Sequence, residues 1–199
     1  MPSATRLPAG DQKLVQIVDA AFADAAQRSG KWLLCRPGCT QCCIGDFEIN
    51  QLDAMRLRQG LAELKKRDPE RAKRVQARVR ESVKRLRQEF PGDVRTGELN
   101  SDEEAQTAFE DFANDEPCPA LDPESGTCDL YVYRPMTCRV FGPPIRSEGG
   151  LGVCELCFQG ASSDEIAACE MNVDPEGLEE KLLQEMKDQN KTIVAWCLR

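Results

Sequence analysis

Apolar residues recur at helical spacing along much of the chain. The first such stretch predicts a helix over 11–29, capped by Asp11 and stopped by Gly30. Its apolar stripe consists of Leu14, Ile17, Val18, Ala21, Phe22 and Ala25. Residues 1–10 contain two prolines and a glycine and carry no such stripe, so we expect a flexible arm there.

Two more helices are predicted within about 50–91. Asn50 is a suitable cap for the first, and Asp68-Pro69-Glu70 begins the second, because proline fits the first helical position. Pro91-Gly92 ends the second helix. The stripes are Leu52, Met55, Leu57, Leu61 and Leu64, then Val75, Val79, Val83, Leu86 and Phe90. We expect the two helices to form an antiparallel hairpin.

Shorter elements follow from local signals. Ser101 with Glu104 is a capping-box pattern that predicts a short helix. The segment 122–126 is typical of a turn, and Asp174-Pro175-Glu176 begins a last helix. The sequence thus predicts a mainly α protein, with an irregular cysteine-rich core packed with several amphipathic helices. We expect one domain over 11–199, in which the hairpin at about 50–91 is an insert.

Composition narrows the functional class. No run approaches the ~18 apolar residues of a membrane span, and the N-terminal residues lack the apolar segment of a secretory signal. We therefore predict a cytoplasmic protein with no membrane partner. In a reducing cytosol, eleven cysteines in 199 residues indicate metal binding or thiol chemistry rather than a disulfide framework.

The chain contains no histidine. Nucleophilic sites that need imidazole and histidine-ligated zinc hydrolases are therefore excluded. Any metal must be held by thiolates, carboxylates or backbone groups, and abundant thiolates suit zinc or iron–sulfur chemistry.

The candidate ligands fall in three segments of the chain. The spacing Cys39-x2-Cys42, like the later Cys154-x2-Cys157, lets two sulfurs reach one ion from a tight turn. Side chains of adjacent residues tend to diverge, so one zinc ion is not expected to bind both Cys42 and Cys43, and several metals or a multi-iron cluster are compatible with the pattern. The predicted metal ligands are Cys35, Cys39, Cys42, Cys43, Cys118, Cys128, Cys138, Cys154 and Cys157.

The identity of the metal stays open between zinc and iron, including a [4Fe-4S] cluster. Ferredoxin spacings are absent, which argues against those folds but not against a cluster in another one. Cys169 is equally compatible with a ligand and with a buried apolar residue, and Cys197 is not expected to bind metal.

Two arginines lie close in sequence to the second cysteine segment. Arg134 and Arg139 are candidate cofactor-binding residues, because guanidinium groups offset the negative charge of a thiolate site. The alternative is structural pairing with Asp129 or with acidic residues upstream.

The net charge of −8 hides two opposite blocks. Residues 56–95 contain fourteen Lys or Arg against six acidic residues, whereas 98–129 contain eleven acidic residues and no basic one. The basic helices could bind nucleic acid, but no aromatic stacking platform accompanies them. We favour pairing with the acidic block, so nucleic acid is disfavoured as a partner.

Four cysteine elements together resemble the YkgJ-type cysteine cluster family. They are the cluster ending in Cys42-Cys43, the elements Cys118-Pro119-Ala120-Leu121 and Gly126-Thr127-Cys128-Asp129-Leu130-Tyr131, and Arg134-Pro135-Met136-Thr137-Cys138-Arg139. That family is a zinc- or iron-chelating domain, also found in flagellin lysine N-methylases. The resemblance implies a metal-binding role for these cysteines. The chain departs from the family's C-x2-C-x2-C-C spacing at Cys35, which precedes Cys39 by one residue more.

The sequence therefore predicts a protein that binds zinc or an iron–sulfur cluster through clustered thiolates. Two alternatives remain open: an iron–sulfur redox protein or enzyme component, and a nucleic-acid-associated protein with structural zinc. The sequence assigns no activity and no protein partner, since no glycine-rich cofactor loop or acid–base–nucleophile set stands out.

Overall fold

The described part of the chain is mostly helical. The computed structural model describes residues 6–147, 149–186 and 188–199. Helix accounts for 49% and strand for 9%, with several of the eleven cysteines clustered, which confirms the predicted mainly α class. None of the helices in these ranges is long and apolar enough to cross a bilayer. Residues 1–5 of the expected flexible arm lie outside the described residues.

The described residues form two compact units. The first unit contains residues 6–7, Gly38–Pro135 and 188–199, and the second contains Pro8–Pro37 and Met136–Met186. The single domain predicted over 11–199, with the helical hairpin as an insert, stays a prediction.

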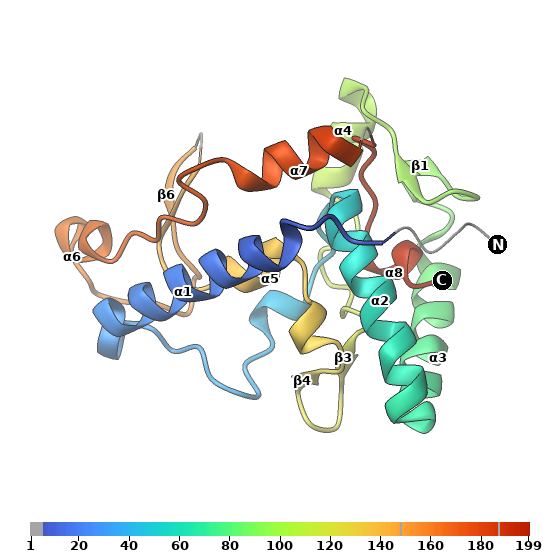
Figure 1. Cartoon of the computed structure of the whole chain (residues 1–199), viewed down its shortest axis with the longest axis horizontal. Helices are drawn as coiled ribbons and strands as arrows, with labels where there is room; N and C mark the ends of the chain where they lie inside the picture. Colours follow the sequence, from blue (N-terminus) through green and yellow to red (C-terminus); the bar gives the residue numbers. More distant parts are fainter. Residues whose placement is uncertain (1–5, 148, 187) are drawn as a thin grey trace. The chain divides into compact units, whose positions relative to one another are not determined.

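A helical hairpin is the largest element of the first unit. α2 (Gln51–Arg67) and α3 (Pro69–Leu86) run antiparallel on either side of Asp68, as the sequence predicts (Figure 1). Asn50 Oδ1 accepts from the backbone N–H of Asp53 at 2.9 Å, and Asp68 Oδ1 accepts from that of Arg71 at 3.0 Å. Both side chains therefore satisfy amides that the first turn of a helix leaves unpaired.

The C-terminal segment completes the core of this hairpin. α8 (Val194–Cys197) packs against α2 and α3, and the strand-like bridge between Ile49 and Thr192 leads the chain into it. α3 ends at Leu86, so the prediction that it continues to Phe90 was wrong. Phe90 instead stacks on Trp196, with ring centroids 4.0 Å apart. The buried core of the hairpin includes Leu57, Leu61, Leu64, Ala72, Val75, Val79 and Val194.

Short elements make up the rest of the first unit. η2 (Gln41–Cys43) and η3 (Tyr131–Tyr133) are single 3₁₀ turns; β1 (Gly92–Asp93) pairs with β2 (Glu98–Leu99), and β3 (Leu121–Asp122) pairs with β4 (Thr127–Cys128), both antiparallel. The cap of α4 (Glu103–Glu110) differs from the prediction. Asp102, not Ser101, accepts from the backbone N–H of Ala105 at 3.0 Å, because its carboxylate stands at the position that reaches that amide.

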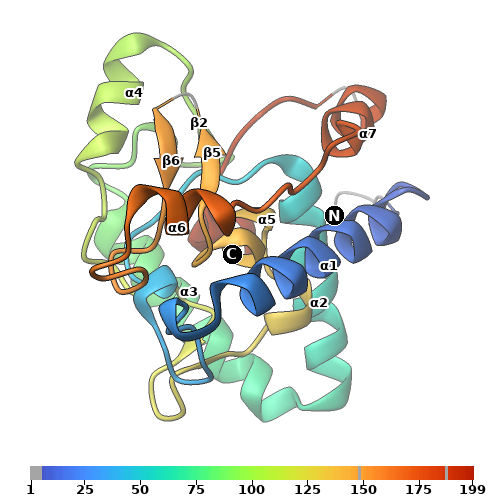
Figure 2. The ribbon, with the colours of Figure 1, turned by 90° about the vertical axis from the view of Figure 1, so that its left-hand side faces the viewer.

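The second unit is arranged along its longest helix. α1 (Asp11–Ser29) contacts α5 (Met136–Val140) and α7 (Leu178–Met186) (Figure 2). The other elements are η1 (Gly30–Trp32), α6 (Ser163–Ala168), and the antiparallel pair β5 (Ile145–Ser147) and β6 (Gly150–Gly152).

Two helix starts in this unit differ from the prediction. Gly10, not Asp11, occupies the N-cap position of α1, so Asp11 is its first helical residue. α7 begins at Leu178 rather than directly after Asp174-Pro175, because Gly177, with φ +61°, turns the chain first. Asp174 Oδ2 still accepts from the backbone N–H of Glu179 at 2.8 Å, and so caps the helix from a distance.

We expect Gly60→Ala to destabilise the first unit although alanine is the better helix former. A Cβ at Gly60 would lie 2.5 Å from Cγ of Tyr133 on η3, where overpacking costs about 1–3 kcal/mol. This exceeds the ~1 kcal/mol that alanine contributes through helix propensity. Urea unfolding measures the difference.

The control is Ala62→Gly on the exposed side of the same helix, which should lower the free energy of unfolding by about 1 kcal/mol through propensity alone. A Gly60→Ala variant more stable than the wild type would contradict close packing of α2 on η3.

Candidate metal centre

A backbone bridge brings the first two cysteine segments together. Ile44 and Pro117 pair as an antiparallel bridge, and the backbone N–H of Cys118 donates to the carbonyl oxygen of Cys43 at 2.8 Å. The N–H of Gly45 donates to the carbonyl of Glu116 at 2.9 Å. Cys43 and Cys118, far apart in sequence, are therefore held as directly paired neighbours.

The β3–β4 hairpin adds Cys128. Leu121 pairs with Cys128 across the hairpin, which returns the chain beside Cys118 as the sequence predicts. At the turn, Gly126 has φ +64°, and a Cβ there would lie 3.3 Å from Cα of Gly38. The turn thus lies against the residues that flank Cys39.

The vicinal thiols interact with each other. A hydrogen bond between the two side chains lowers the pKa of Cys42 to about 6 and raises that of Cys43. Cys42 therefore carries the negative charge of the pair. Both cysteines are in the 3₁₀ turn η2, and the expectation that they do not bind one zinc ion together stays a prediction.

The remaining thiols of this group resist ionisation. Burial, followed by the charge of Cys128, raises the pKa of Cys118 to about 12. Burial also raises the pKa of Cys128, with Asp129 and Cys42 adding to the effect. The charges of Cys118 and Cys128 act in turn on Cys43, so the four thiols lie within electrostatic reach of one another. All four can ionise together only if a cation offsets the repulsion.

The described thiols of this group lie near one another but do not form a preorganised metal site. Among residues 6–147, 149–186 and 188–199, no three cysteine, aspartate or glutamate side chains are arranged so that they could already hold a metal ion. No disulfide joins two cysteines of the described structure. In the first unit, metal binding would replace the hydrogen bond between Cys42 and Cys43 with bonds to the metal.

Asp46 is a functional candidate that sequence reasoning missed. Its Oδ2 is buried and accepts no hydrogen bond in the described structure. Burial, followed by the charge of Glu116, raises its pKa to about 7, and its charge acts on Cys118. An unsatisfied buried carboxylate oxygen beside thiols fits a cation site. The only sequence signal is its position three residues after Cys43.

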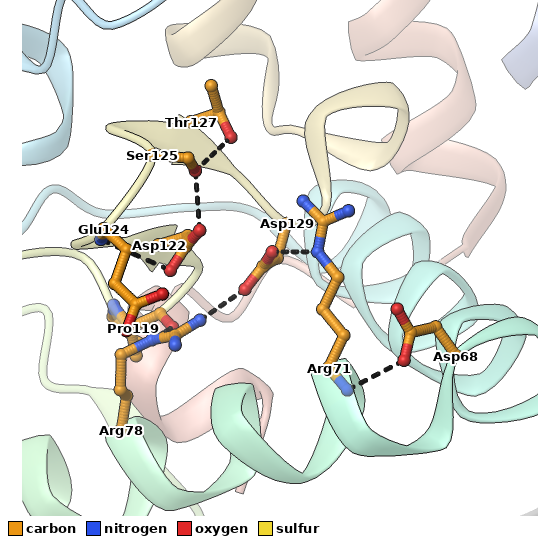
Figure 3. A network of polar contacts seen from close by, with 9 residues as sticks. All are labelled: Asp68, Arg71, Arg78, Pro119, Asp122, Glu124, Ser125, Thr127 and Asp129. Atoms are coloured by element: carbon orange, nitrogen blue, oxygen red, sulfur yellow. Dashed lines mark hydrogen bonds and ion pairs between the residues drawn. The ribbon is translucent and has the colours of Figure 1, made fainter.

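The basic helix α3 holds the hairpin that carries Cys128. Figure 3 shows the Asp129 carboxylate between Arg71 and Arg78, which form ion pairs with its two oxygens. The Asp129 side chain is only 1% exposed. Arg78 Nε also donates to the carbonyl oxygen of Pro119 at 2.9 Å, so one guanidinium contacts the neighbours of both Cys118 and Cys128.

The expected pairing of the basic and acidic blocks is confirmed at three arginines. Besides Arg71 and Arg78, Arg85 forms an ion pair with Glu116, which precedes Cys118 by two residues. The charge pattern therefore serves to fix the second cysteine segment on α3.

The two predicted cofactor arginines have different surroundings. Arg134 lies over the ring of Tyr131, 4.0 Å from its centroid, and adds to the lowering of the Cys42 pKa after the Cys43 hydrogen bond. Arg139 is 2% exposed and donates to both carboxylate oxygens of Asp19 at 2.8 and 3.0 Å. Arg139 thus has the structural pairing with an upstream acid, and its role toward a cofactor stays a prediction.

The remaining predicted ligands belong to the second unit. Cys138 is on α5, and Cys35 has its sulfur beside Gly142. Cys154 and Cys157 lie in a buried cluster together with Cys169. In the first unit, Cys197 donates from Sγ to the carbonyl oxygen of Ala54 at 3.3 Å, and burial raises its pKa to about 12, as for a thiol in an apolar core.

The sequence model of the CxxCxxCC family matches residues 34–157, and that family is described as a putative zinc- or iron-chelating domain. The chain belongs to the CxxCxxCC family. The match covers more than half of the chain and confirms the resemblance noted from the sequence. It contains the nine predicted ligands and leaves Cys169 and Cys197 outside. No curated protein and no solved structure matched the chain.

We expect Asp129→Asn to lower the free energy of unfolding by about 2–3 kcal/mol. The substitution removes a buried carboxylate and both of its ion pairs, whereas Arg71 and Arg78 are partly exposed and can be hydrated instead. Denaturant unfolding measures the loss. The control is Glu70→Gln, whose pairing with Lys73 is exposed and should contribute under about 0.5 kcal/mol. Equal effects of the two variants would contradict a structural role for Asp129.

We expect Asp46 to contribute a loss of stability to the metal-free protein as the pH rises from about 4 to about 7. Unfolded aspartate has a pKa of about 3.9, whereas that of folded Asp46 is about 7, so within this window the folded state keeps a proton that the unfolded state releases. Asp46→Asn removes this contribution.

Denaturant unfolding at several pH values, with Asp115→Asn as the exposed control, measures the slope. Asp46→Asn should flatten it and make the metal-free protein more stable at pH 7.5, and Asp115→Asn should leave it unchanged. An unchanged slope in Asp46→Asn would contradict the burial of this carboxylate.

Proposed function

We propose that the first unit binds zinc or iron through the thiolates of Cys42, Cys43, Cys118 and Cys128, with Cys39 beside them. The observation that carries this proposal is the backbone pairing that joins Cys43 to Cys118 and returns Cys128 beside Cys118. Burial, together with the charges of the neighbouring thiols, raises the pKa values of Cys118 and Cys128. Buried like charges are stable together only with a counter-ion, and the family is described as zinc- or iron-chelating.

The donor set agrees with this class of metal. Thiolates are soft ligands that select zinc or iron–sulfur clusters over magnesium or calcium, and the chain has no imidazole to compete with them. Four thiolates around a divalent ion leave a net negative charge. Arg134 lies close enough to act on Cys42 and Cys128 and would offset part of it.

Zinc and a four-iron cluster share this thiolate chemistry. The surplus of thiols over the four that one zinc ion takes supports a centre of more than one metal atom. The hydrogen bond between the Cys42 and Cys43 side chains supports binding of one metal centre by both sulfurs. Bound metal would supply folding energy, because the thiols converge only in the folded unit.

The alternative of nucleic-acid binding has little support. Arg71, Arg78 and Arg85 of the basic helix are in ion pairs with the acidic block, so their charges are already engaged. Electron transfer and enzyme chemistry remain without an assigned substrate or partner, and a cytoplasmic location stays a prediction.

We expect Cys118→Ser to lose the metal of the first unit and Cys197→Ser to keep it. Both thiols belong to the first unit and pack against its core, but only Cys118 interacts with other thiols, so the pair separates ligation from packing. Cys197→Ser should cost about 1–3 kcal/mol of stability through a buried hydroxyl.

The measurement is zinc, iron and acid-labile sulfide per chain after anaerobic purification. Iron with sulfide identifies a cluster, and zinc alone identifies a zinc site. Wild-type protein with neither metal, or equal metal content in the two variants, would overturn the proposal.

A further inference from the structure

The second unit contains a cysteine knuckle of its own. The backbone N–H of Cys157 donates to the carbonyl oxygen of Cys154 at 2.8 Å, which closes the turn between them. The two residues are only 6% and 3% exposed. Phe158 follows with φ +57°, a left-handed conformation that non-glycine residues rarely adopt, so the surrounding structure enforces the turn.

A backbone amide points at the sulfur of Cys157. The N–H of Leu34 donates to Cys157 Sγ at 3.4 Å, and the N–H of Phe158 donates to the carbonyl oxygen of Trp32 at 2.9 Å. These two bonds fix the segment 32–34 along the knuckle. An amide directed at a sulfur orients it, as outer-shell hydrogen bonds orient the ligands of a metal site.

The same segment delivers Cys35 to this region. Cys35 Sγ lies 2.6 Å from the position that a Cβ at Gly142 would occupy, so glycine at 142 leaves room for this sulfur. The carbonyl oxygen of Gly142 accepts from the backbone N–H of Cys154 at 3.4 Å. Gly142 therefore contacts both Cys35 and Cys154. The extra residue between Cys35 and Cys39 coincides with this separate placement of Cys35.

Cys169 adds a fourth thiol. It is 4% exposed and packs in one buried cluster with Cys154, Cys157 and Phe158. It follows α6, whose start is fixed by a capping box at Ser162. Arg28 donates to the carbonyl oxygens of Ala168 and Glu170, at 2.5 and 3.0 Å, and so holds the backbone on both sides of Cys169.

We propose that Cys35, Cys154, Cys157 and Cys169 form a second, structural zinc site within the second unit. Four thiolates in a closed tetrahedral set are a composition typical of structural zinc, and a C-x2-C knuckle supplies half of that set. The site uses none of the thiols proposed for the first unit, and Cys169 lies outside the residues matched by the family.

Packing of plain buried thiols is the competing explanation. It accounts for the apolar neighbours Leu33 and Ile166, but not for an amide aimed at the sulfur of Cys157. It also does not account for Cys35, which is exposed to solvent and yet has its sulfur against Gly142.

The test is a titration of the metal-free full chain with Zn²⁺ alone, followed by measurement of bound zinc. The variants are Cys169→Ala, Cys118→Ser and Cys197→Ala, with circular dichroism to verify folding. Cys169→Ala should bind one zinc fewer than the wild type and keep the first-unit metal. Cys197→Ala should bind as much as the wild type.

The outcomes separate the two proposals. Unchanged zinc in folded Cys169→Ala would overturn the second site. The first-unit centre would be overturned if Cys118→Ser kept the wild-type content of zinc, iron and sulfide. Alkylation of the wild type gives a readout that needs no variant. Zn²⁺ should protect the exposed thiol of Cys35 at least tenfold in rate, and an unprotected Cys35 would overturn its role in the site.

Discussion

The buried carboxylate of Asp129 between Arg71 and Arg78 is the interaction on which the first unit depends. Asp129 directly follows Cys128, and Arg78 also binds the carbonyl oxygen of Pro119, next to Cys118. Cys118, which precedes β3, and Cys128, on β4, are thereby both held against one face of α3. A hairpin this short has no hydrophobic core of its own and depends on such external support. The basic helices are therefore part of the support of the cysteine centre.

This arrangement explains why the thiols can stay close without a disulfide. Backbone hydrogen bonds between Cys43 and Cys118 and across β3–β4 fix the backbone positions of these cysteines. Their thiolate forms would repel one another. In the metal-free protein, protonation of the thiols avoids this repulsion. The pKa of Cys42 is lowered, whereas the pKa values of Cys43, Cys118 and Cys128 are raised. The backbone arrangement thus exists without a metal, and the proposed ligation would exchange the protons of these thiols for the ion.

Much of this fold could be predicted from the sequence because its signals are local. Asn50 and Asp68 cap the helices that they were expected to cap, and the turn at 122–126 folds Cys128 back beside Cys118. The errors are also local. At α4 two neighbouring polar residues could cap the helix, and at α1 the expected cap became the first helical residue. Single-sequence reasoning cannot rank candidates one residue apart, because tertiary contacts choose between them.

The candidate site was harder to predict because it depends on long-range pairing. The spacing of Cys39 and Cys42 indicates a metal, but nothing in it reveals that Ile44 pairs with Pro117 or that Asp46 becomes buried beside Cys118. Similarly, the sequence groups Cys35 with Cys39, Cys42 and Cys43, whereas in the structure the sulfur of Cys35 lies beside Gly142. Such neighbours become visible only when backbone hydrogen bonds between distant segments are known.

The bridge between Ile49 and Thr192 has a consequence for biosynthesis. It leads into Ile193, Val194 and Trp196, which are buried in the first unit, and Trp196 stacks on Phe90. A ribosome makes the cysteines at 39–43 long before it makes these residues. The nascent chain therefore carries these cysteines before the core around them is complete, and the first unit can reach its final packing only after residue 196 has been made.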